Sequence, residues 1–205
     1  MILPTHEECL DYFEEYKVPD NIKRHCITVW HAARTLGIHL EQAGVPVNQR
    51  LLESLAIMHD LFKMVSIRDF GTGVHAKAEL SDDQRKMWIE LRERFPGMHE
   101  GQVAHLIFKD KYPEFAVSLK NVCNPGIENP TLEEGIVHYC DWRVFQNSIV
   151  TIPVRLEYLK KHYGRDPAVW DSFARNIERI EARIFSSLSF SPEKLNEKVQ
   201  QRAAA

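Results

Sequence analysis

Apolar residues recur at steps of three and four along most of this chain, and this spacing constrains its fold more than any other feature. The clearest run is Ile22, Cys26, Val29, Ala33, Leu36 and Leu40. An α-helix has 3.6 residues per turn, so such steps place side chains on one helical face. We find no alternating pattern long enough for a regular strand, and no internal repeat. Because 205 residues suffice for one substantial core, the sequence predicts an all-α, single-domain helical bundle.

Capping residues, glycines and prolines mark where the expected helices begin and end. We expect helices over about 5–16, 20–43, 48–60, 81–95, 99–109, 113–122, 131–144 and 167–184, and a last polar helix that begins near Ser191-Pro192. Glycines and charged residues between Ser66 and Leu80 predict a loop. We divide the chain into a helical domain over 1–190 and a polar C-terminal tail over 191–205.

Composition excludes several classes of protein. The 26 basic and 29 acidic residues give a net charge of −3, which offers no basic surface for a nucleic-acid polymer. The apolar runs are too short to cross a membrane. Four scattered cysteines, and an N-terminus without the features of a secretory signal, predict reduced thiols and a cytoplasmic location. Apolar faces on the C-terminal helices either cap the core or pair two subunits, so a homodimer stays open.

Four ionisable residues fall at inward positions of three expected helices. They are His25, the adjacent pair His59 and Asp60, and Asp141. A lone buried histidine or aspartate costs several kcal/mol unless it is paired or bound to a metal. The four residues therefore suggest one shared centre. Two imidazoles and two carboxylates form a nitrogen and oxygen donor set that suits one divalent ion of Mn, Fe, Co, Ni, Zn or Mg.

The order of these residues, with their flanking sequence, resembles the HD-domain superfamily of metal-dependent phosphohydrolases. The segment 19–25 (PDNIKRH) is similar to the family's helix with the first histidine, and 55–63 (LAIMHDLFK) to the run with the His-Asp pair. Segments 112–116 and 136–144 are similar to its later helices. The resemblance spans roughly 18–150 and leaves the C-terminal quarter uncovered.

The resemblance implies a helical HD-type fold and hydrolysis of a phosphomonoester or phosphodiester by metal-activated water. The expected substrate is a nucleotide or another small phosphorylated metabolite. His25, His59, Asp60 and Asp141 are the expected metal ligands. Around them we place further residues: Lys63, Arg68, His75 and Lys77 as substrate-binding groups, with Lys63, Asp69 and His99 as catalytic candidates and Glu100 as an alternative to His99.

The sequence departs from the family pattern at two places that affect the prediction of a catalytic metal site. Phe62 stands where glycine is usual, and no histidine occurs around 120–122, where relatives with two metals have one. The missing histidine favours a single ion over the di-iron, oxygen-using centre of some relatives. The other alternative is a metal-containing regulatory or ligand-binding module without catalysis. We interpret His138, one turn before Asp141, as a structural neighbour rather than a ligand.

Overall fold

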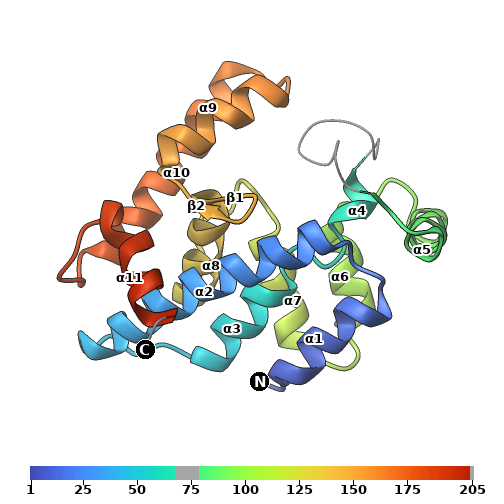
Figure 1. The fold of residues 1–205 in the computed structure, drawn as a ribbon, viewed down its shortest axis with the longest axis horizontal. Helices are drawn as coiled ribbons and strands as arrows, with labels where there is room; N and C mark the ends of the chain where they lie inside the picture. Colours follow the sequence, from blue (N-terminus) through green and yellow to red (C-terminus); the bar gives the residue numbers. More distant parts are fainter. Residues whose placement is uncertain (68–78, 204–205) are drawn as a thin grey trace.

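The computed structural model describes residues 1–67 and 79–203 of the chain, and in them the predicted all-α fold is confirmed (Figure 1). Its helices are α1 (His6–Glu15), α2 (Asp20–Gln42), α3 (Gln49–Met58), α4 (Lys63–Ser66), α5 (Asp82–Arg94), α6 (Glu100–Phe108), α7 (Pro113–Val122), α8 (Leu132–Arg143), α9 (Ile152–His162), α10 (Pro167–Phe185) and α11 (Leu195–Ala203). Strands β1 (Val144–Phe145) and β2 (Ser148–Ile149) pair antiparallel, with Phe145 opposite Ser148.

The helices begin where the sequence places their caps. Thr5, Ser81 and Thr131 each accept a hydrogen bond from the backbone three residues later, and the side chain there bonds back to the cap. Each reciprocal pair satisfies two backbone donors that a helix start leaves free. Asp166 caps α10 at the N–H of Ala168. Local chemistry therefore sets the helix boundaries.

Helix α2 is the centre of the packing. It lies against α3, α8 and α11, while α3 also contacts α1 and α7. The predicted apolar face of α2 is buried along its whole length, from Ile22 to Leu40. Because α2, α3 and α8 pack together, the residues expected to form the metal centre are held by three mutually supporting helices.

Part of the structure lies outside the sequence-based expectations. We expected no element at α4, at the β1–β2 hairpin or at α9. Helix α9 buries only Ile152 and extends away from the helices around α2 (Figure 1). Its Tyr158 ring packs against Phe145 of β1, with 4.4 Å between ring centroids. Ile152, Leu156 and Leu159 also recur at helical steps in α9, a short apolar face that our expected helices left out.

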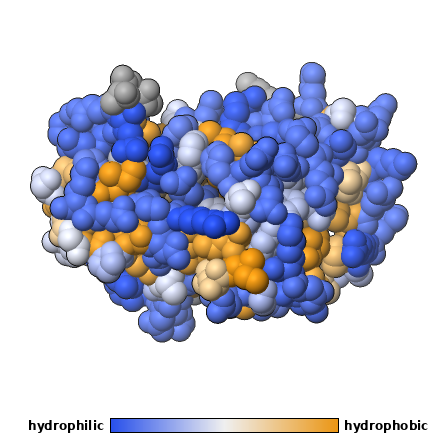
Figure 2. All heavy atoms as spheres, turned by 90° about the horizontal axis from the view of Figure 1, so that it is seen from below, coloured by the Kyte–Doolittle hydropathy of each residue, from blue (hydrophilic) through white to orange (hydrophobic). Residues whose placement is uncertain are grey.

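The C-terminal segment packs on the body of the molecule. Leu195 at the start of α11 is fully buried, and α11 contacts α2, beside which Figure 1 draws it. In the described residues, none of the helices combines the length and the apolar character that crossing a bilayer demands. On the face drawn in Figure 2, hydrophobic residues form separate patches among hydrophilic ones. The possible homodimer stays a prediction.

Candidate metal centre

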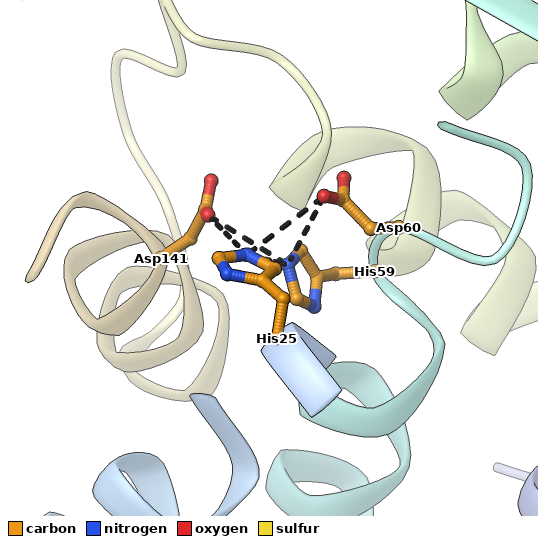
Figure 3. Close-up of side chains that lie close together, drawn as sticks. All are labelled: His25, His59, Asp60 and Asp141. Atoms are coloured by element: carbon orange, nitrogen blue, oxygen red, sulfur yellow. Dashed lines mark hydrogen bonds and ion pairs between the residues drawn. The ribbon is translucent and has the colours of Figure 1, made fainter. Parts of the chain in front are cut away.

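The side chains of His25, His59, Asp60 and Asp141 converge from three helices (Figure 3). His25 lies in the second turn of α2, His59 and Asp60 follow the last residue of α3, and Asp141 lies near the end of α8. One ligand atom from each residue lies within 4.8 Å of the other three. The convergence that the sequence predicts is therefore present.

Both histidines are oriented by main-chain carbonyls. Nδ1 of His25 lies 3.2 Å from the carbonyl oxygen of Gln146, and Nδ1 of His59 lies 2.8 Å from that of Ala56. A carbonyl only accepts, so each Nδ1 is the donor. In the neutral imidazole this leaves the Nε2 lone pair facing the carboxylates. Metal-binding histidines are typically held by such an outer hydrogen bond.

The spacing of the inward atoms fits a metal ion. Nε2 of His25 is 3.0 Å from Asp141 Oδ1 and 3.4 Å from Nε2 of His59. The other nitrogen–oxygen separations, from both histidines to Asp60 Oδ2 and from His59 to Asp141 Oδ1, are each 3.8 Å. Two ligands that are each about 2.1 Å from an ion stand about 3.0–3.4 Å apart in octahedral or tetrahedral coordination. The four atoms therefore need only small shifts to hold one ion.

Both carboxylates of the cluster are held in their ionised form. Burial raises the pKa of Asp141, but hydrogen bonds from His25 and His59 outweigh it and hold that pKa well below the usual value. Burial also opposes ionisation of Asp60, whose pKa is lowered by Lys63 and His59. Burial disfavours charged His59, yet Asp60 and Asp141 raise its pKa to about 9. A divalent cation replaces such imidazole protons as the source of positive charge.

The two oxygens of Asp60 have separate partners. Oδ2 faces the histidines, whereas Oδ1 lies 3.2 Å from the ammonium of Lys63. Lys63 also lies 3.2 Å from Oε1 of Glu100, which is 3% exposed. The predicted substrate-binding residue Lys63 is thus adjacent to the cluster and is held by two carboxylates.

His99, a predicted catalytic residue, lies at the start of α6. It caps α6, where its Nδ1 accepts a hydrogen bond from the N–H of Gly101, and its Nε2 lies 3.3 Å from Glu100. Within the described part of the chain, its contacts lead to the cluster through Glu100 and Lys63. The predicted residues Arg68, Asp69, His75 and Lys77 lie outside the residues that the structure describes.

His138 and Phe62 are both buried. His138 is 2% exposed and its Nδ1 lies 3.4 Å from the carbonyl oxygen of Val122. Phe62 is 1% exposed and packs edge-on against Tyr16, with 4.8 Å between ring centroids. Phe62 is therefore a core residue of this fold.

Several groups that support the centre were not predicted from the sequence. The carbonyls of Ala56 and Gln146 orient the two imidazoles, Ser66 bonds to Glu100, and the Cys123 thiol donates to the carbonyl of His59 at 3.0 Å. A main-chain carbonyl leaves no signal in residue type. The sequence alone does not show that Ser66 and Cys123 lie near the centre, because their contacts depend on the path of the folded backbone.

Comparison of the chain with protein-family models, with curated proteins and with solved structures gives no match.

Proposed function

We propose that this protein is a metal-dependent phosphohydrolase that cleaves a phosphomonoester or phosphodiester of a nucleotide or small phosphorylated metabolite. The observation that carries the proposal is the convergence of His25, His59, Asp60 and Asp141, with both Nδ1 atoms already engaged by carbonyls. The sequence resemblance to HD-domain phosphohydrolases supplies the reaction class.

The donor set favours borderline and hard divalent ions such as Mn²⁺, Fe²⁺, Co²⁺, Ni²⁺, Zn²⁺ or Mg²⁺ over metals that prefer thiolates. When bound, such an ion lowers the pKa of a coordinated water and polarises a phosphoryl oxygen. His25 and His59 would supply neutral nitrogen ligands, and Asp60 Oδ2 and Asp141 Oδ1 would supply the negative charge.

The exposure of the ligands indicates where a substrate enters. The side chain of His59 is 3% exposed and that of Asp60 is 11% exposed, whereas that of Asp141 is 30% exposed. Access to the centre is therefore from the Asp141 side. Lys63, at 33% exposure, reaches the same centre and offers an N–H to a phosphoryl oxygen as a compact positive charge.

The proposal predicts turnover by the metal-loaded protein. Phosphomonoesters and phosphodiesters, nucleotides among them, are assayed with Mn²⁺, Co²⁺ or Ni²⁺. Loss of an outer-shell partner typically costs a metal site 10–100-fold, so removal of a ligand in His59→Ala should lower kcat/KM by at least about 100-fold. His162→Ala, an exposed histidine on α9, is the matched control and should retain activity.

Other results would favour one of the two alternative functions. Bound metal without turnover of any ester would favour a regulatory or ligand-binding module. Two irons per chain, with oxygen consumption, would favour the di-iron reading. Equal activity in His59→Ala and the wild type would contradict the proposed site.

A further inference from the structure

Glu100 is a buried carboxylate with no place in the four-residue cluster. It is the first residue of α6 and is 3% exposed. Oε1 lies 3.2 Å from the Lys63 ammonium, and Oε2 accepts a hydrogen bond from the Ser66 hydroxyl. The N–H of Glu100 donates back to the Ser66 oxygen at 3.1 Å. A buried carboxylate costs several kcal/mol unless its partners are well placed, and here both oxygens are engaged.

Lys63 is held at two of its three donor positions. Its Nζ lies 3.2 Å from Asp60 Oδ1 and 3.2 Å from Glu100 Oε1. An ammonium has three N–H groups, so the contacts within residues 1–67 and 79–203 leave one N–H for a ligand. A lysine side chain is long and flexible, so contact with Asp60 alone would not fix the direction of the ammonium.

Charge alone does not explain why a third carboxylate lies here. With neutral imidazoles, the carboxylates of Asp60, Asp141 and Glu100 outnumber the single ammonium of Lys63 by two, and one divalent ion cancels that excess. Glu100 therefore weakens the attraction of the loaded centre for a phosphate anion. Its benefit is the fixed direction that it gives to the ammonium.

We propose that Glu100 is a positioning residue, which fixes Lys63 beside Asp60 so that its remaining N–H meets a phosphoryl oxygen of the substrate. The inference rests on the proposed phosphohydrolase function and deepens it. Ser66 holds Glu100 in turn, so the short helix α4 presents both the ammonium and the hydroxyl that anchors its carboxylate partner.

The direct test compares Glu100→Gln, Lys63→Met and the double variant in kinetics of the metal-loaded protein. The amide keeps the shape of Glu100 but loses its charge. A displacement of about 1 Å can cost about 100-fold in rate, so Glu100→Gln should lower kcat by about 10–100-fold. KM should not rise, because the variant centre is one unit more positive. Lys63→Met should lower kcat and raise KM.

The double variant separates positioning from a general structural role. If Glu100 acts through Lys63, Glu100→Gln should have no further effect on kcat in the Lys63→Met background. Contacting residues that work together give such non-additive effects, whereas independent ones add. Fully additive losses, or an unchanged kcat in Glu100→Gln, would overturn the inference while leaving the phosphohydrolase proposal intact.

Glu134→Gln is the matched control. Glu134 is also buried, at 4% exposed, and it bonds to its N-cap backbone and to Asn121. Its replacement should lower the melting temperature comparably but leave the kinetic effect of Lys63→Met unchanged. Non-additivity of the same size between Glu134 and Lys63 would also overturn the inference.

A second readout does not need turnover. Labelling of Lys63 by an amine-reactive acetylating reagent, followed by peptide mass spectrometry, should be several-fold faster in Glu100→Gln, because the ammonium loses a partner. Labelling equal to that of the wild type would contradict the positioning role. Absence of hydrolysis by the wild type would contradict the proposed function, and the labelling would still decide whether Glu100 fixes Lys63.

Discussion

Gln146 connects backbone conformation to the candidate metal centre. Its carbonyl accepts the Nδ1–H of His25, and its φ of 57° lies in the left-handed region. It occupies the first position of the two-residue turn between β1 and β2, and glycine is the residue that adopts such a positive φ most readily. A residue other than glycine there costs about 1–2 kcal/mol. The turn thus holds a strained residue that orients a metal ligand.

Gln146→Gly should therefore relieve strain and keep metal binding. Glycine adopts positive φ freely but loses about 0.5–1 kcal/mol of entropy on folding, so stability should rise by up to about 1 kcal/mol. Metal affinity should be unchanged, because the carbonyl remains. Gln146→Pro fixes φ near −65° and should weaken metal binding about 10–100-fold. Urea unfolding and calorimetric metal titration measure both effects.

Lys17→Gly provides the comparison for this prediction. Lys17 also has a positive φ, of 49°, but it lies just after α1, where helices often end in this conformation. Its replacement should relieve strain without any effect on metal binding. Loss of metal affinity in Gln146→Gly would show that the glutamine side chain, and not the carbonyl, supports His25.

At this scale, the sequence identified the side chains but not their supports. Histidines and aspartates at inward helical positions are conspicuous because burial without a partner is costly. The carbonyls of Ala56 and Gln146 act through the main chain, which the residue type does not reveal. Only the folded backbone reveals which carbonyl faces which imidazole.

Helices α6 and α7 approach closely at Gly101, next to the proposed positioning residue. A Cβ at Gly101 would lie 2.9 Å from Cβ of Cys123 and 3.0 Å from the carbonyl oxygen of Lys120. Neither atom is the end of a flexible side chain, so the helices would have to separate. Cys123 also donates to the carbonyl of His59, which links this contact to the metal centre.

Gly101→Ala should destabilise the fold by about 1–3 kcal/mol, as overpacking typically does. Gly135→Ala, in α8, is the control, because its nearest neighbour would be at an ordinary 3.5 Å and alanine favours a helix over glycine by about 1 kcal/mol. Chemical denaturation of both variants measures the difference. Equal stabilities would mean that the α6–α7 spacing adapts without cost.

Helix prediction succeeded where a capping residue or a long apolar face marks the helix. Helices α2 and α10 carry long apolar faces, and α8 begins at a capping box. Helix α4 is a single turn, β1 and β2 have two residues each, and α9 has only a short apolar face that ends in two partly buried leucines. Short elements depend on tertiary contacts, and the order of residues along the chain does not reveal those contacts.

At the scale of the whole molecule, the candidate centre joins segments more than a hundred residues apart. His25 and Asp141 meet at 3.0 Å. Helices α2, α3 and α8, which carry the ligands or directly precede them, also form the middle of the core. A cation bound between them crosslinks the fold. It should therefore stabilise the native state as a whole, by about 2.7 kcal/mol at a concentration one hundred times Kd.

The most direct test is metal content measured together with thermal stability. After loading and dialysis, the wild type should retain one divalent ion per chain and melt at a higher temperature than the metal-free protein. Asp141→Asn, which keeps the shape of the side chain but removes its charge, should lose both the ion and the stabilisation. Failure of the wild type to retain any divalent ion, or equal retention by Asp141→Asn, would contradict the metal centre on which this account rests.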